Sequence, residues 1–171
     1  MSDRLIVKII TPEKVVFYHE ADSILLPGTL GEMEVLPGHV AIFSTIEPGS
    51  VIARDGKRTL NVACGTGLLE VKDNMVSLLV DSAVGCSEID PEAARRLIEE
   101  AEDKLKNLEN EDAETRYAFE TQLATAKARI EVFEKNKDNK DDYEAQEGFS
   151  RYEMPPVEKK AAESGGTTDN P

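Results

Sequence analysis

The spacing of apolar residues changes once along this chain, at Ile89, and the change predicts a fold in two parts. Residues 4–84 carry short apolar runs separated by Gly, Pro, Asp-Gly and Asp-Asn, which is the pattern of an all-β sandwich or barrel. After Ile89 the apolar residues recur at the i, i+3, i+4 spacing of amphipathic helices. We therefore expect a β-sandwich domain over residues 1–88, followed by helices.

The apolar runs also place individual strands within the sandwich. The expected strands are residues 5–10, 15–18, 21–26, 34–36, 41–45, 49–53, 58–63, 67–72 and 75–83. Asp55-Gly56 and Asp73-Asn74 are expected to form hairpin turns, because Asp, Asn and Gly tolerate the positive φ of two-residue turns. Most neighbouring strands should then run antiparallel.

Residues 89–135 are expected to form an antiparallel hairpin of two helices. Asp90-Pro91 is a helix start, with a capping side chain and a first-turn proline, and a polar break follows at residues 110–112. The first apolar stripe is Ala94, Leu97, Ile98, Ala101, Leu105 and Leu108, and the second is Phe119, Leu123, Ala126, Ile130 and Phe133. Both stripes are narrow and rich in alanine, so the hairpin is either a weakly held, movable element or simply a small appendage.

The rest of the composition limits the environment and the partners. Residues 136–171 are polar and acidic and are expected to be disordered, because they offer too little apolar surface to offset the entropy of ordering. A net charge of −14 disfavours nucleic acid and anionic lipid surfaces as partners. No apolar run is long enough for a membrane span, and the start lacks a signal or transit sequence. Cys64 and Cys86 are expected to be reduced rather than paired.

The residues that enzymes need for chemistry are nearly absent, so we expect a non-catalytic protein without cofactor or metal. His19 and His39 lie outside any array with metal-ligand spacing, and no nucleophile elbow, Cys-x-x-Cys or Gly-Lys-Ser/Thr phosphate loop occurs. Gly65-Thr66-Gly67 is interpreted as a bulge or a close approach of two backbones rather than as a phosphate cradle.

The segment from Gly28 to His39 is expected to form a tight turn, a short strand and a second tight turn, as a compact loop rather than a core element. Its glycines permit positive φ, and Pro37-Gly38 is the pair that a type II turn prefers. Glu32 lies just after the glycine-rich turn, where a carboxylate has no evident structural role. It is either a solvated loop charge or a group that meets a partner.

Six segments in order resemble the epsilon subunits of F-type ATP synthases over residues 4–133. They are Pro12-Glu13-Lys14-Val15, residues 28–39, Thr45-Ile46-Glu47-Pro48-Gly49, Gly67-Leu68-Leu69-Glu70-Val71, Asn74 and Val76 with Asp81 and Ala83, and Glu88-Ile89-Asp90. The fold that the resemblance implies is a flattened ten-stranded β-sandwich followed by two antiparallel helices.

The resemblance also implies a function, that of a central-stalk subunit that performs no chemistry. Its sandwich would link the gamma subunit to the membrane ring of proton-carrying subunits. Its hairpin would extend into the alpha/beta catalytic head to block ATP hydrolysis. The residues expected to face the ring are Gly31, Glu32, Pro37, Gly38 and His39. The expected location is peripheral, on the cytoplasmic face of a bacterial inner membrane, without insertion into the bilayer.

One departure from the family bears on nucleotide binding. Members that bind ATP share Ile-Asp-x-x-Arg-Ala at the start of the first helix, whereas this chain has Ala93 in place of the arginine. We therefore expect no nucleotide site, with Asp90, Arg95 and Arg129 as the remaining weak candidates. Two alternatives are a free-standing ATP-sensing regulatory protein and a small β-sandwich hydrolase or sugar binder. The second fits poorly with 5% aromatic residues and no Trp.

Overall fold

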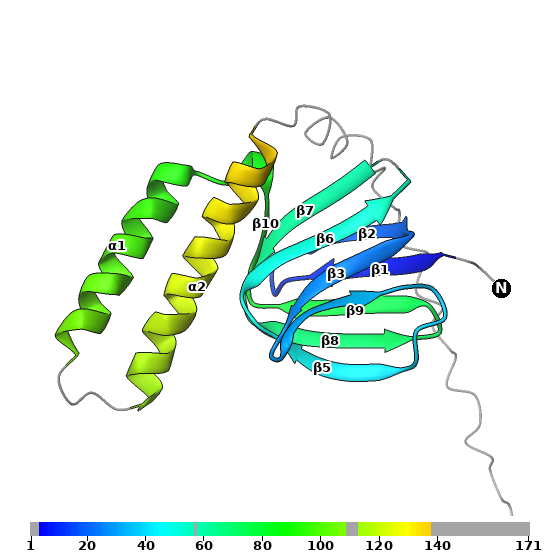
Figure 1. Cartoon of the computed structure of the whole chain (residues 1–171), viewed down its shortest axis with the longest axis horizontal. Coiled ribbons are helices and arrows are strands. Elements are labelled where there is room, and N and C mark those ends of the chain that lie inside the picture. The colour runs from blue at the N-terminus through cyan, green and yellow to red at the C-terminus, as the bar shows by residue number, and fades with distance from the viewer. Residues whose placement is uncertain (1–3, 57, 109–112, 138–171) are drawn as a thin grey trace, which may run out of the picture.

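The computed structural model describes residues 4–56, 58–108 and 113–137, and its first part is built from ten strands (Figure 1). The strands are β1 (Leu5–Ile10), β2 (Val15–Ala21), β3 (Ser23–Gly28), β4 (Gly31–Val35), β5 (Ile42–Ile46), β6 (Gly49–Asp55), β7 (Arg58–Cys64), β8 (Gly67–Lys72), β9 (Met75–Val80) and β10 (Ala83–Gly85). A 3₁₀ turn, η1 (Cys86–Glu88), leads to helices α1 (Pro91–Asn107) and α2 (Ala113–Asn136). The fold class expected from the sequence is confirmed.

The strands form one hydrogen-bonded sheet in the order β10-β7-β6-β3-β5-β8-β9-β1-β2, with β4 paired to β3. Neighbours are antiparallel except for β1 and β9, which run parallel. The sheet curves over, so that β2 comes to lie beside β6 and the two layers enclose a common interior (Figure 1).

The interior of the sandwich is filled by alternate residues of its own strands. In β1, for example, Leu5, Val7 and Ile9 are fully buried, whereas the residues between them are partly exposed. This period of two follows from the pleat of a strand. In the part of the chain that the structure describes, every buried residue of the main core comes from the strands and none from the helices. At about 1.5–3 kcal/mol for each buried Leu, Ile or Val, this core is the principal source of stability.

Two turns and one close backbone approach follow the sequence analysis. Asp73 and Asn74 have φ of 50° and 60°, which confirms the β8–β9 hairpin turn. Asp55 pairs directly with Arg58, so the β6–β7 turn begins at Gly56, one residue later than expected. A Cβ built on Gly67 would lie 2.2 Å from the carbonyl oxygen of Leu79, which confirms the expected close approach of two backbones.

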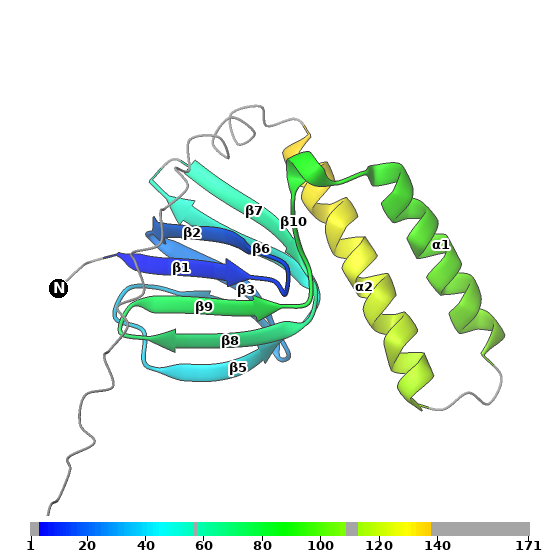
Figure 2. The same cartoon turned by 180° about the vertical axis from the view of Figure 1, so that it is seen from behind.

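The helices cover one end of the sandwich in two steps. α2 packs on β6 and β7, and α1 packs on the far side of α2, as the two opposite views show (Figures 1 and 2). α1 begins at Pro91 as expected, while α2 continues to Asn136, one residue into the stretch expected to be disordered. The remainder of that stretch, residues 138–171, lies outside the described residues.

Candidate functional site

The Gly28–His39 segment is a tight turn, a short strand and a second tight turn, as expected. The strand is paired with β3 and contributes Val35 to the core, so the expectation of a compact loop outside the core is wrong. Gly31 pairs with Gly28, and the pairing continues along β4 to Val35, which lies opposite Ile24. The strand forms because Met33 and Val35 both point inward, Met33 against the core and Val35 fully buried within it. Gly31 has a φ of 117°, whereas Gly28 has no positive φ.

The second turn is the type II turn that Pro37-Gly38 predicts. The His39 amide donates to the Leu36 carbonyl oxygen over 3.1 Å, and Gly38 has a φ of 83°. The Gly38 amide also donates to Asn74 Oδ1 over 2.7 Å, and His39 Nδ1 lies 2.8 Å from the carbonyl oxygen of Val40. The turn is therefore tied to the β8–β9 hairpin.

The residues expected to face the ring are thus divided between the two ends of β4. Gly31 and Glu32 lie beside the exposed hairpin tip at Leu30, whereas residues 37–39 follow the other end. At about 3.3 Å per residue, Glu32 and Pro37 are about 16 Å apart along the chain. In the described part of the chain β4 pairs with β3 alone, so both groups border one free strand edge.

The two carboxylates of β4 differ in their partners. Glu34 accepts a hydrogen bond from Arg54 Nη1 over 2.8 Å, which neutralises its charge. Glu32 is exposed and makes no hydrogen bond or ion pair within the described ranges 4–56, 58–108 and 113–137. Its carboxylate is therefore available to a group outside this chain.

An outer apolar face, which the sequence analysis missed, covers neighbouring strands of the sandwich. It consists of four large apolar residues whose exposed fractions are high: Phe43 (70%), Leu68 (40%), Met75 (42%) and Leu79 (51%). Strand register places them on one side of β5, β8 and β9, because Leu68 lies opposite Leu79, Met75 opposite Lys72 and Phe43 opposite Glu70. The exposed Glu70 and Lys72 side chains share this face with them. Large exposed apolar patches mark interaction sites. The available signal was that β8 and β9 carry Leu-Leu pairs, which are apolar on both faces.

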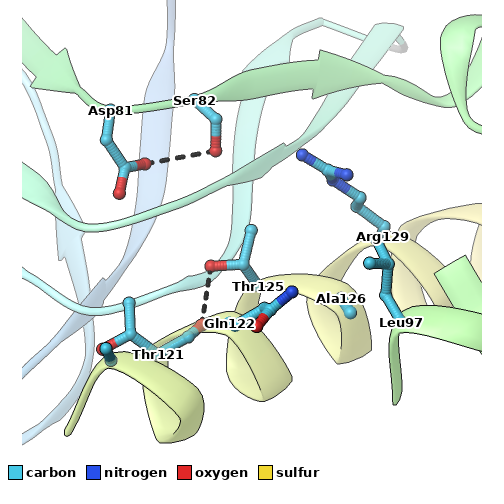
Figure 3. Close-up of a pocket in the computed structure, with 9 residues that line it drawn as sticks. Asp81, Ser82, Leu97, Thr121, Gln122, Thr125, Ala126 and Arg129 are labelled. Atoms are coloured by element: carbon cyan, nitrogen blue, oxygen red, sulfur yellow. Dashed lines mark hydrogen bonds between the residues drawn. The ribbon is translucent and has the colours of Figure 1, made fainter. Parts of the chain in front are cut away.

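A pocket of about 370 Å³ lies between the helical hairpin and the turn from β9 to β10 (Figure 3). Its lining residues are Asp81, Ser82, Leu97, Ala118, Thr121, Gln122, Thr125, Ala126 and Arg129. The Asp81 carboxylate accepts hydrogen bonds from Thr66 Oγ1 at 2.9 Å and Ser82 Oγ at 3.1 Å. The partly buried Arg129 side chain extends from α2 toward the β9–β10 connection, which carries Ser82 (Figure 3).

The weak nucleotide candidates do not converge on this pocket. Asp90 caps α1, accepting hydrogen bonds from the amides of Glu92 at 2.9 Å and Ala93 at 3.1 Å. Arg95 donates to Glu134 Oε1 over 3.2 Å and thereby joins the two helices. Of the three candidates, only Arg129 lines the pocket.

A small apolar contact, also missed from the sequence, holds α2 on the sandwich. Its buried residues are Ala63, Cys86, Ile89, Ala128 and Val132. Helical periodicity puts Ala128 and Val132 on a different face of α2 from most of the expected stripe, although Phe133 of that stripe also packs against this contact. Because α2 is apolar on two faces, its docking face does not stand out in the sequence.

Both cysteines are free and buried, but in different places. Cys64 belongs to the sandwich core, where burial and then the charge of Asp81 raise its thiol pKa to about 12. Cys86 lies beneath α2, and burial raises its thiol pKa as well. Within the described residues, no helix is long and apolar enough to cross a membrane.

The chain is similar to known proteins, both in its β-sandwich domain and over most of its length. The family model of the ATP synthase delta/epsilon chain beta-sandwich domain matches residues 4–85. The ATP synthase epsilon chain of Geobacter sulfurreducens is 35% identical over 132 residues, which is 77% of this chain and 95% of that protein. The ATP synthase epsilon chain of Synechococcus elongatus is 32% identical over 128 residues, which is 75% of this chain and 93% of that protein.

Solved structures share the fold. A chain in the cryo-EM structure of the Euglena gracilis mitochondrial ATP synthase superposes with a TM-score of 0.64 at 23% identity, covering 77% of this chain and 82% of that one. The match of the family model over residues 4–85 assigns the sandwich to the delta/epsilon class. The chain belongs to the ATP synthase epsilon chain family. Its relatives are subunits of ATP synthases, the class of protein that the sequence led us to expect.

Proposed function

We propose that the chain joins the gamma subunit to the membrane ring of an F-type ATP synthase and transmits torque between them. The observation that carries this proposal is the outer apolar face, Phe43, Leu68, Met75 and Leu79. A linking subunit needs two surfaces on one rigid body, and the strand-built core provides such a body. The outer apolar face and the free edge of β4 are the two surfaces.

The outer apolar face is assigned to the gamma subunit. Permanent interfaces are more apolar than the rest of a protein surface and bury large side chains. Lasting contact with another stalk subunit removes these side chains from water.

The β4 edge is assigned to the ring. Glu32 carries an unneutralised charge at one end, and the anchored turn of Pro37, Gly38 and His39 lies at the other. Exposed rim charges orient partners more than they add affinity. Such a contact suits a subunit that must dock in one orientation on a ring.

The helical hairpin is assigned a second role, the inhibition of ATP hydrolysis. It is docked by the small contact of Ala63, Cys86 and Ile89 with Ala128 and Val132, whereas the sandwich core does not depend on it. Such an element undocks at a lower free-energy cost than global unfolding. Once released, it would extend along gamma into the alpha/beta head. The subunit works peripherally, on the cytoplasmic face of a bacterial inner membrane.

The decisive experiment disrupts the outer apolar face without touching the core. Leu68→Glu/Leu79→Glu places two charges on this face, and Tyr117→Glu, at a 59% exposed position on α2, is the control. We expect the double variant to melt like the wild type but to lose copurification with gamma and the ring, while the control retains it. Unchanged copurification of a folded double variant would contradict the assignment.

The alternative of a free-standing ATP-sensing regulator predicts saturable ATP binding by the isolated chain. The pocket presents one guanidinium, that of Arg129, where phosphate recognition calls for several positive or bidentate donors. We expect calorimetric titration to show weak ATP binding or none. Stoichiometric binding below 1 mM, on the order of physiological ATP, would favour the alternative.

A further inference from the structure

Arg129 is a partly buried cation without a partner in the described part of the chain. Its neighbours on the hairpin are paired, since Arg95 meets Glu134 at 3.2 Å and Lys127 meets Glu102 at 3.3 Å. No hydrogen bond or ion pair joins Arg129 to residues 4–56, 58–108 or 113–137, although its guanidinium extends into the pocket (Figure 3). A guanidinium that is partly withdrawn from water calls for an acceptor.

The other groups of the pocket define what that acceptor should carry. The side-chain amide of Gln122 offers further donors, whereas the one hydroxyl proton of Ser82 is already donated to Asp81. Asp81 also lines the pocket, and its charge is only partly compensated by the hydroxyl groups of Thr66 and Ser82. The complementary ligand is therefore a peptide of mixed charge that offers a carboxylate to Arg129 and an ammonium group to Asp81.

The chain itself supplies such a peptide immediately after α2. Residues 138–147 read Asp-Asn-Lys-Asp-Asp-Tyr-Glu-Ala-Gln-Glu, in which Lys140 is the single cation among five carboxylates. Arg129 and Asn136 are seven residues apart, so they share a helix face about 10.5 Å apart along the axis. From residue 137 to 142, an extended chain spans about 17 Å, enough to return to Arg129.

We propose that residues 138–147 bind in this pocket, with a carboxylate of the segment on Arg129, and so hold the hairpin on the sandwich. The pocket contains residues of both parts, Asp81 and Ser82 from the β9–β10 turn and Arg129 from α2, so an occupant bridges them. A tethered ligand acts at an effective concentration in the millimolar range, so a single weak ion pair is sufficient. The proposal is independent of the assembly proposed above.

The test uses the full-length chain with a photoreactive residue at the exposed, pocket-lining position Gln122. One variant converts Asp138, Asp141, Asp142 and Glu144 to their amides, and the matched control does the same at Glu153, Glu158, Glu163 and Asp169. Cross-linked peptides are identified by mass spectrometry. We expect cross-links to residues 138–147 in the wild type and the control, and a loss of roughly two- to fivefold in the first variant, the effect of one partly exposed ion pair.

Substitution of the arginine gives the reciprocal test. Arg129→Gln should lose the same cross-links, Arg129→Lys should retain most of them, and Arg116→Gln, at an exposed position of the same helix, should leave them unchanged. A melting curve establishes that each variant is folded. The proposal would be overturned if the wild type gave no cross-links to residues 138–147, or if the variant with four amide substitutions gave the same yield as the wild type. A competition experiment with ATP could overturn it too. That outcome would be loss of the cross-link on addition of ATP, together with equal ATP affinities for the wild type and the amide variant.

Discussion

Asn74 Oδ1 accepts the Gly38 amide over 2.7 Å, which joins the turn after β4 to the β8–β9 hairpin, 36 positions further along the chain. Asn74 has a φ of 60°, so the same residue adopts the left-handed turn and supplies the acceptor. The Pro37-Gly38-His39 turn is therefore held by a residue that sequence proximity would not single out. Its orientation depends on a contact between two hairpins.

Asn74→Ala should loosen that turn. The substitution removes the hydrogen-bond acceptor of the Gly38 amide. It also places alanine, which has no polar side chain to stabilise the left-handed conformation, at a positive φ. We therefore expect the free energy of unfolding to fall by about 1–2 kcal/mol. Asn74→Asp retains an acceptor and tolerates the φ, so it serves as the control. Chemical denaturation of both variants measures the difference. Equal midpoints for alanine and wild type would show that the contact contributes nothing.

Cys64 should make the sandwich sensitive to alkaline pH. Its thiol has a pKa of about 12 in the folded state against an ordinary 9.0, so between these values the unfolded chain loses the proton while the folded chain keeps it. Stability must therefore fall as the pH rises through this window, by at most about 1.4 kcal/mol per pH unit.

The comparison of slopes isolates this effect from other alkaline titrations. Cys64→Ala removes the thiol and should give a shallower fall in the free energy of unfolding between pH 9 and 11, whatever its offset at neutral pH. Denaturant titrations across that range provide the measurement. Parallel curves for the two proteins would mean that the buried thiol does not control alkaline stability.

Val132→Ala should release the hairpin without unfolding the sandwich. Val132 is fully buried in the contact that covers Cys86. Its truncation should cost about 2 kcal/mol, or about 30-fold in the equilibrium for undocking. Alkylation of Cys86 should accelerate accordingly, whereas Cys64, which lies in the strand-built core, should react as slowly as before. Acceleration at both cysteines would indicate global unfolding instead, and Tyr117→Ala is the control substitution.

Deletion of residues 90–171 should raise ATP hydrolysis by the assembled synthase and leave ATP synthesis intact. The hairpin is the proposed blocking element. Among the described residues none beyond Ala83 belongs to the main core, so the remaining domain should fold alone. Cooperative melting of the truncated chain is the control. Deletion of residues 138–171 should not raise hydrolysis, because both helices remain. Equal hydrolysis with and without the hairpin would remove inhibition from the proposed function.

Glu32→Lys should weaken the association with the ring, and more so at low salt than at high salt. The carboxylate is exposed and unpaired within the described residues, so a reversed charge acts on the partner through screened electrostatics. Glu34→Lys breaks the pair with Arg54 in the same strand and is the matched comparison. Proton-driven ATP synthesis by reconstituted complexes measures coupling. Wild-type coupling across the salt range would show that Glu32 is only a solvated charge.

The sequence by itself determined the elements of this protein. The change of apolar period at Ile89 separated strands from helices, Asp90-Pro91 placed the start of α1, and Asp73-Asn74 and Pro37-Gly38 predicted their turns correctly. These features are local, because capping, turn conformation and periodicity depend on neighbouring residues. Family-wide segments in order were also enough to identify the class.

Tertiary structure decided which of these residues meet. Glu32 and the Pro37-Gly38-His39 turn lie at opposite ends of β4, because Met33 and Val35 pack into the sandwich and fix the residues between them as a strand. Tertiary packing also forms the outer apolar face, the buried contact between Val132 and Cys86, and the pocket around Arg129. Each of these depends on strand register or on how the hairpin packs, so its residues come from distant segments. No local pattern encodes which face of α2 meets the sheet when both faces are apolar.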